Sequence, residues 1–268
     1  MSEDIKIVIT GKGGAGKTTL TSILCHLLSD KEYNVLALDE DPQMNLPFAL
    51  GLDENRVSEI VPLNENDDYI EEKTGARPNT GFGAYFRLNP PVEDVVERFG
   101  ITVKEGLHLL VMGTVKKAAA GCLCPENALL DAVVKYISLR KGELIVMDTQ
   151  AGVEHFGRSL SQGFKHCIVV TDDTYNAMSV ACHSAKLAKE IGIEHVHLVF
   201  NRVDESSNKV ERIKSILGVP ERDFFDSITY LPYQKEILDF EPDMSKIAGD
   251  FTLFYVKKID ELCNKLIS

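Results

Sequence analysis

The sequence predicts an α/β fold: one domain with a mostly parallel, seven- or eight-stranded twisted sheet flanked by helices on both faces. Short apolar, β-branched runs alternate with longer segments of helical period, which is the pattern of repeated βαβ units. The short runs are almost continuously apolar, as expected for strands that are covered on both faces. The chain has 268 residues, 44% of them hydrophobic, which is enough material for one large core.

Seven strands are expected, at residues 5–9, 34–38, 107–111, 143–147, 167–170, 196–200 and 227–231. Helices are expected near residues 17–30, 126–140, 175–191, 207–217 and 251–266. Residues 53–106 break this alternation, because they carry turn formers and charge without a clean period. We interpret this stretch as an insertion within the domain, since its length exceeds that of an ordinary connection.

The composition excludes several classes of function. Lys and Arg number 29 against 41 Asp and Glu, so the net charge of −12 leaves no broad basic footprint for nucleic acid. No secretion signal and no run of 18 apolar residues is readable, so we expect no membrane span and a cytoplasmic location. Six cysteines without regular spacing favour a reducing compartment over a disulfide scaffold.

The strongest motif is GKGGAGKTT at residues 11–19, between an expected strand and an expected helix. A glycine-rich turn there aims backbone N–H groups at phosphate from a helix N-terminus, which predicts a P-loop for ATP or ADP. Lys17 would reach the β and γ phosphates, the Thr18 hydroxyl would bind Mg²⁺, and Thr19 would donate to an outer phosphate. A glycine loop without a ligand is the alternative, and the complete motif in this context disfavours it. The candidate nucleotide-binding residues of the loop are Gly11, Gly13, Gly14, Ala15, Gly16, Lys17, Thr18 and Thr19.

Acidic residues follow two of the expected strands. In the DEDP segment, Asp39 and Asp41 can point the same way from an extended strand end, toward Mg²⁺ and the attacking water. We assign Asp41 to positioning that water and Asp39 to the Mg²⁺ shell, with capping of the next helix as the alternative. Asp148 ends the strand at 143–147, with Gly152 four residues further, which is typical of a Walker B aspartate and a switch loop.

Cys122 and Cys124 lie in the segment GCLCPEN. On an extended segment residues i and i+2 face one side, so both sulfurs can bind one thiophilic metal. Zn²⁺ and square-planar Ni²⁺ each need four donors, so a symmetric dimer that brings two pairs to its axis would complete the site. The alternative is a pair of buried, inert thiols, which the surrounding polar turn disfavours. The other cysteines lie in apolar segments and are expected to pack in the core: Cys25, Cys167, Cys182 and Cys263.

Together these motifs resemble the CooC-type (CooC/AcsF) nickel-insertion maturation ATPases. This family belongs to the MinD/nitrogenase-iron-protein class of deviant Walker A P-loop NTPases. The resemblance extends along the chain through GKGGAGKTT, DEDP, EEKTG, LNP, MGTVKKAAAGCLCPEN, DTQAGVEHFGR, NRV and LPY. It implies a homodimer that forms on ATP or metal binding, with Ni²⁺ or Zn²⁺ held by Cys122 and Cys124 of both subunits. The implied client is a nickel enzyme, either carbon monoxide dehydrogenase or acetyl-CoA synthase.

The resemblance also implies roles for residues outside these clusters. Lys12, the second lysine of the loop, would reach across the two-fold axis to the nucleotide of the other subunit and act in catalysis with Lys17. Asn201, followed by Arg202, would hydrogen-bond the adenine edge, although Asn is also an ordinary turn residue after a strand. Backbone groups beside the base would come from the LPY turn: Leu231, Pro232 and Tyr233.

Two other functions stay open. A MinD- or ParA-like positioning ATPase would act on membrane or DNA, but the amphipathic segment 251–268 mixes charges and lacks a basic face, so it is expected to pack on the sheet. An iron–sulfur reductase or scaffold ATPase would also need two cysteines per subunit. The sequence leaves undecided which nickel enzyme is served and which metal is physiological.

Overall fold

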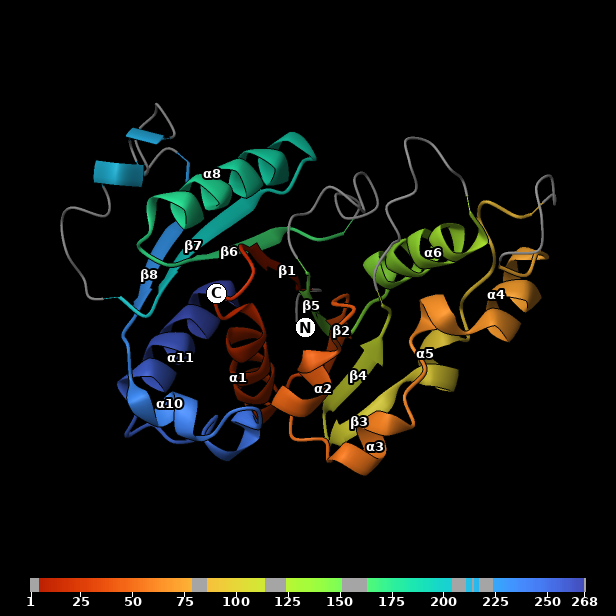
Figure 1. Ribbon diagram of the computed structural model, residues 1–268, viewed down its shortest axis with the longest axis horizontal. Helices are drawn as coiled ribbons and strands as arrows, with labels where there is room; N and C mark the ends of the chain where they lie inside the picture. The colour runs from red at the N-terminus through yellow and green to blue at the C-terminus, as the bar shows by residue number, and fades with distance from the viewer. Residues whose placement is uncertain are drawn as a thin grey trace.

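The computed structural model describes residues 5–78, 86–113, 124–150, 163–203, 211–213, 215–216 and 224–267. These residues form a single α/β domain around an eight-stranded sheet of order β3-β4-β2-β5-β1-β6-β7-β8 (Figure 1). Every pairing is parallel except the one between β3 and β4 at one edge. The predicted fold class is therefore confirmed. The strands are β1 Lys6–Gly11, β2 Val35–Asp39, β3 Ile101–Lys104, β4 Leu107–Val111, β5 Leu144–Asp148, β6 His166–Thr171, β7 His195–Asn201 and β8 Ser227–Leu231.

Helices cover both faces of the sheet. Helices α1 and α11 lie side by side on one face, and α6 and α8 cover the other (Figure 1). Most of the predicted helix near 207–217 falls outside the described residues, although 211–213 and 215–216 are helical. The helices are α1 Lys17–Asp30, α2 Asn45–Ala49, α3 Glu54–Ser58, α4 Asp67–Thr74, α5 Val95–Phe99, α6 Pro125–Leu139, α8 Tyr175–Glu190, α10 Lys235–Asp239 and α11 Phe254–Leu266, with 3-10 turns at Leu63–Glu65 and Met244–Lys246.

The three central strands are β2, β5 and β1, and every residue in them is buried. Their parallel register sets Asp148 beside both Ile9 and Asp39. Because parallel strands end at the same edge, the segments that follow β1, β2 and β5 meet there. This edge therefore brings the P-loop, the DEDP segment and Asp148 together.

The predicted insertion at 53–106 contains short helices and one strand that the sequence did not suggest. Strand β3 pairs antiparallel with β4, and its residues are only partly buried or exposed. A half-exposed edge strand needs no continuous apolar run, so the pattern that identifies the buried strands is missing from it. No helix within the described ranges is both long enough and apolar enough to cross a lipid bilayer.

Candidate functional site

The loop between β1 and α1 has the backbone of a tight glycine turn. Gly14 and Gly16 adopt φ angles of +77° and +92°, and Gly11 has φ of +142°. A Cβ added to Gly11 would lie 2.1 Å from the Val170 carbonyl oxygen, so any side chain there would collide with β6. The loop therefore needs glycine at these positions, because other residues rarely adopt this backbone. Helix α1 starts at Lys17, so its free N–H groups face the loop.

Lys17 folds back over this loop. Its Nζ donates to the carbonyl oxygen of Gly11 at 3.2 Å and to that of Lys12 at 3.4 Å. Burial lowers the pKa of Lys17, while the nearby carboxylate of Asp148 opposes the shift. Lys12 itself is exposed. The two lysines of the motif thus differ, because Lys17 is held inside the site while Lys12 extends from its surface.

Thr18, which is partly exposed, and Asp148, which is buried, form a hydrogen-bonded pair beside the loop. The Thr18 Oγ1 donates to Asp148 Oδ2 at 2.7 Å, and Asp148 is only 1% exposed. Its second oxygen, Oδ1, is buried and forms no hydrogen bond of normal geometry among the described residues, although the Thr21 hydroxyl lies near this carboxylate. Burial raises the pKa of Asp148 to about 6. A hydroxyl beside a carboxylate with an unsatisfied oxygen fits Mg²⁺, which prefers such oxygen ligands.

The two aspartates after β2 have different surroundings. Asp39 is fully buried, and its carboxylate accepts from the backbone N–H groups of Asp41 at 2.9 Å and Leu46 at 3.3 Å. This matches the alternative in which Asp39 organises the turn before α2, and its role in the Mg²⁺ shell stays a prediction. Asp41 is partly exposed and lines the main cleft beside the P-loop. Its position is therefore compatible with orienting a water molecule, which also stays a prediction.

Glu40, between these aspartates, was not predicted as part of the site. It is 1% exposed, and its Oε2 accepts from the backbone N–H of Gln150 at 3.2 Å. Burial raises the pKa of Glu40 to about 8. This carboxyl joins the segment after β2 to the segment after β5. The sequence offers one signal for this position. Successive side chains of a strand point to opposite sides, so Glu40 must face away from Asp39 and Asp41.

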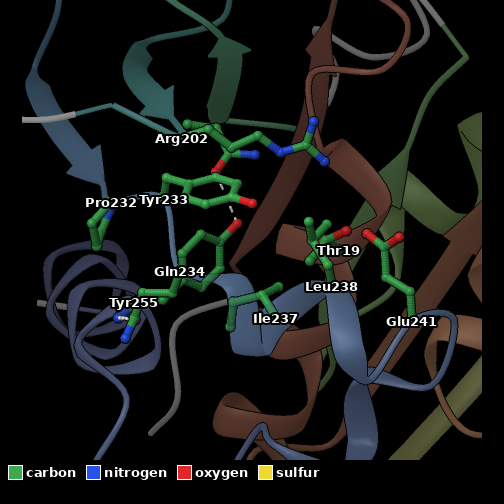
Figure 2. Close-up of a pocket in the computed structure, with 10 residues that line it drawn as sticks. Thr19, Arg202, Pro232, Tyr233, Gln234, Ile237, Leu238, Glu241 and Tyr255 are labelled. Atoms are coloured by element: carbon green, nitrogen blue, oxygen red, sulfur yellow. Dashed lines mark hydrogen bonds between the residues drawn. The ribbon is translucent and has the colours of Figure 1, made fainter.

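A cleft of about 520 Å³ lies along this edge of the sheet. A smaller pocket adjoins it and is bounded by the start of α1, the end of β7, the segment 232–241 and Tyr255 of α11 (Figure 2). Thr19, Arg202 and Glu241 line both cavities. The structure thus brings the predicted base-binding residues Arg202, Pro232 and Tyr233 to the pocket beside the P-loop. Leu231 is completely buried at the end of β8 and does not line either cavity.

Asn201 is 2% exposed and contacts the P-loop directly. Its Nδ2 donates to the Ala15 carbonyl oxygen at 2.7 Å, and its Oδ1 accepts from the Tyr255 hydroxyl at 3.0 Å. Sequence reasoning did not foresee either partner. Both the nitrogen and the oxygen of this amide already have a hydrogen-bond partner within the protein. The contact of Asn201 with adenine stays a prediction.

Cys124 occupies the N-cap position of α6 and is partly exposed. Pro125 follows at the first helical position, where its missing N–H costs nothing. Cys122 and Gly152 lie outside the described residues. The four cysteines expected in the core are all buried, which confirms their packing role: Cys25, Cys167, Cys182 and Cys263.

Comparison with known proteins agrees with this geometry. Residues 6–241 match the family model of the CobQ/CobB/MinD/ParA nucleotide binding domain. The chain is 36% identical over 199 residues to the carbon monoxide dehydrogenase accessory protein CooC of Rhodospirillum rubrum, covering 74% of each chain. It is 35% identical over 239 residues to an uncharacterized ATP-binding protein of Methanocaldococcus jannaschii, covering 88% of each chain.

Solved structures share the fold at lower sequence identity. MinD in the MinC:MinD cell division complex of Aquifex aeolicus superposes with a TM-score of 0.67 at 22% identity, over 98% of this chain and 95% of that one. The septum site-determining protein MinD of Pyrococcus horikoshii, complexed with Mg-ADP, gives a TM-score of 0.62 at 20% identity over the same shares. With its P-loop intact, the chain belongs to the CobQ/CobB/MinD/ParA nucleotide-binding domain family and is an ATPase.

Proposed function

We propose that this ATPase is a dimerising maturation factor that hydrolyses ATP to assist nickel insertion into carbon monoxide dehydrogenase or acetyl-CoA synthase. The observation that carries the proposal is the 36% identity to a carbon monoxide dehydrogenase accessory protein over 74% of both chains. Cys122 and Cys124 give this chain a thiol pair suited to nickel. The metal is cargo in this proposal and not a resident cofactor.

Residues of the P-loop would bind MgATP in the cleft. Thr18 and Asp148 would hold Mg²⁺, which would help to neutralise the charge of the phosphates. Lys17 would exchange its contacts with the loop carbonyls for the β and γ phosphates, because the phosphates carry a full negative charge. Asp41 would orient the attacking water from the cleft wall, where its carboxylate lies.

A second copy of the chain would complete both sites. Helix α6 connects the end of β4 to the start of β5, so its N-terminus lies toward the carboxyl edge of the sheet. Cys124 begins this helix, and Lys12 is exposed in the loop after β1. Cys124 and Lys12 therefore belong to the same edge of the domain. A two-fold contact across this edge would join two thiol pairs and give each lysine access to the partner's nucleotide.

An anaerobic Ni²⁺ titration followed by size-exclusion chromatography tests the proposal. We expect the wild type to bind one nickel ion per dimer, and the variant Cys122→Ser/Cys124→Ser to lose this binding because its donors are gone. Cys182→Ala is the matched control, since Cys182 is buried in α8 and should leave nickel binding unchanged. One nickel ion per dimer in the double variant would contradict the proposal.

A MinD-like positioning role is the second candidate, because the fold superposes on MinD. The apolar face of α11 is already buried in the core beside α1, and of its large apolar side chains only Phe254 is exposed, which is too little for a membrane-binding face. Pelleting with liposomes in the presence of ATP separates the two functions. We expect the protein to stay in the supernatant, whereas ATP-dependent pelleting would favour the positioning role. A brown anaerobic preparation with broad visible absorption would instead favour an iron–sulfur protein.

A further inference from the structure

A buried chain of hydrogen bonds joins helix α11 to the P-loop. The Tyr255 hydroxyl donates to Asn201 Oδ1 at 3.0 Å, and Asn201 Nδ2 donates to the Ala15 carbonyl oxygen at 2.7 Å. Tyr255 and Asn201 are each 2% exposed. Burial raises the pKa of Tyr255, so its hydroxyl keeps the proton that it donates. Both side chains are thus almost completely covered by protein.

The chemistry of the groups fixes the direction of these bonds. The Ala15 carbonyl can only accept, so the NH₂ group of Asn201 must face it. The amide oxygen of Asn201 then faces Tyr255, whose hydroxyl serves as the donor. Replacing the tyrosine hydroxyl would leave a buried amide oxygen without its donor, which is costly because Asn201 is only 2% exposed.

The carbonyl that Asn201 holds belongs to the same peptide unit as the N–H of Gly16. In a planar trans peptide the C=O and N–H point in opposite directions, so fixing one fixes the other. The Ala15 carbonyl points toward Asn201, and the Gly16 N–H therefore points away from it. Gly16 lines the main cleft, where the loop would meet phosphate. Contact is close on the Asn201 side, since a Cβ on Gly16 would lie 2.2 Å from Asn201 Nδ2.

Tyr255 also ties α11 to the smaller pocket. Its backbone N–H donates to Gln234 Oε1 at 2.6 Å, and both residues line that pocket (Figure 2). Residue 255 lies outside the range 6–241 that matches the family model. The contact is thus supplied by a part of this chain beyond the matched nucleotide-binding domain.

We propose that Tyr255 is a positioning residue for nucleotide binding, which orients the Ala15–Gly16 peptide of the P-loop through Asn201. The hydroxyl holds the Asn201 amide in place, and the amide holds the loop in the conformation that phosphate requires. Such preorganisation lowers the cost of binding without new contacts to the ligand. The inference rests on the ATP hydrolysis within the proposed function and is independent of nickel.

The test is Tyr255→Phe, which removes the hydroxyl and keeps the buried ring. We expect KM for ATP and the Kd of MgADP each to rise roughly tenfold, within the range for an unsatisfied buried polar group. Once the phosphates are bound, they restore the direction of the Gly16 N–H, so kcat should change less than about twofold. Unchanged KM and Kd would overturn the proposal.

Tyr69→Phe is the matched control. Tyr69 is 1% exposed, and its hydroxyl donates to Asp94 Oδ1 at 3.1 Å within the insertion. Both variants lose a buried hydroxyl, so a merely structural role would lower thermal stability in both and leave both KM values alone. A KM that rises equally in the two variants would also overturn the proposal.

A double-mutant cycle with Asn201→Ala tests whether Tyr255 acts through Asn201. We expect Tyr255→Phe to add no further change in KM in that background, because the link to Ala15 is already broken. Effects that multiply would contradict action through Asn201. These measurements use only ATP and ADP. A wild type that hydrolyses ATP but binds no nickel would contradict the maturation role and leave this test intact.

Discussion

Single side chains at the carboxyl edge of the sheet differ in how firmly the fold holds them. Lys17, Asp148 and Asn201 are buried, and each forms a hydrogen bond with a residue of the P-loop. Lys12 and Gln150 are exposed. Buried groups with fixed partners reorganise little when a ligand arrives, which is what electrostatic stabilisation of phosphate requires. The exposed groups are those that a second molecule can reach.

Asp148→Asn tests the Mg²⁺ site at this scale. We expect the Kd of ADP measured with Mg²⁺ to rise by about tenfold or more, since a neutral amide is a weaker ligand than a carboxylate. The Kd measured without Mg²⁺ should change little. Because the pKa of Asp148 is raised to about 6 by burial, Mg²⁺-dependent binding in the wild type should weaken as the pH falls below that value. Calorimetric titration with and without Mg²⁺ measures both effects, and equal losses in both conditions would refute the assignment.

Residues of the P-loop could be predicted from the sequence because their chemistry is local. The glycines, Lys17 and Thr18 all lie within one nine-residue motif, at residues 11–19. Glu40 and Tyr255 could not be predicted, since each acts through a partner that only the fold brings near. Tyr255 meets Asn201 across 54 positions of the chain, and no periodicity records such a contact.

At the scale of elements, strands β6 and β7 carry a cluster of histidines at their amino ends, opposite the nucleotide edge. His166 lies beside His195 in the parallel register, and its Nδ1 is 3.1 Å from His197 Nε2. His197 Nδ1 lies 2.8 Å from the Ser227 hydroxyl, and His195 pairs with Asp226. At least one ring of the 3.1 Å pair must be neutral to accept a hydrogen bond.

This cluster predicts acid sensitivity. Burial lowers the pKa of His197 to about 4, and His166 beside it lowers that pKa further, as do His195 and Lys189, while Asp226 opposes the shift. In the unfolded chain this histidine binds a proton with its ordinary pKa of 6.5, whereas in the folded state it stays neutral at that pH. Stability from this residue is therefore complete above pH 6.5 and is lost as the pH falls toward 4. The expected loss at about pH 5 is about 2 kcal/mol.

Urea unfolding of the wild type and His197→Gln, at about pH 7.5 and about pH 5, measures this loss. The buried carboxyls of Glu40 and Asp148 have raised pKa values, so their protonation stabilises the fold on acidification and opposes the histidine effect. The comparison between variants removes this shared contribution. We expect a smaller acid loss in His197→Gln, whereas His183→Gln, on the exposed face of α8, should behave like the wild type. Identical acid losses in all three proteins would refute the prediction.

The other seven strands could be predicted because each is a short, mainly apolar run, and their observed bounds differ from the predicted ones by at most two residues. Strand β3 could not, although Ile, Thr and Val favour strands, because ITVK is only four residues long and half-exposed and so lacks a continuous apolar run. The short helices of the insertion could not be predicted either. They are five to eight residues long, too short for a helical period to stand out.

For the whole molecule, the proposed mechanism requires two chains to meet across the carboxyl edge of the sheet. Lys12→Ala tests this arrangement. We expect the variant to bind MgADP like the wild type and to lose most of its ATP turnover, because the missing ammonium would act on the partner's nucleotide. Lys257→Ala, an exposed lysine on α11, is the control and should hydrolyse ATP normally.

Light scattering supplies the matching measurement of mass. The wild type should double in mass with MgATP, and the Lys12→Ala variant allows the same comparison without turnover. A wild type that stays a single chain with every nucleotide and metal would refute the dimeric mechanism. Normal turnover in Lys12→Ala would instead refute the cross-subunit role of the lysine.

The strand order has a consequence for how the protein is made. Strand β1, which leads into the P-loop, is synthesised first but sits between β5 and β6, which emerge from the ribosome much later. Both of its neighbours in the sheet, β5 Leu144–Asp148 and β6 His166–Thr171, are translated only after β2, β3 and β4. A nascent chain therefore carries its glycine loop without the neighbouring strands until β5 and β6 have been made, so we expect ATP binding only after that point.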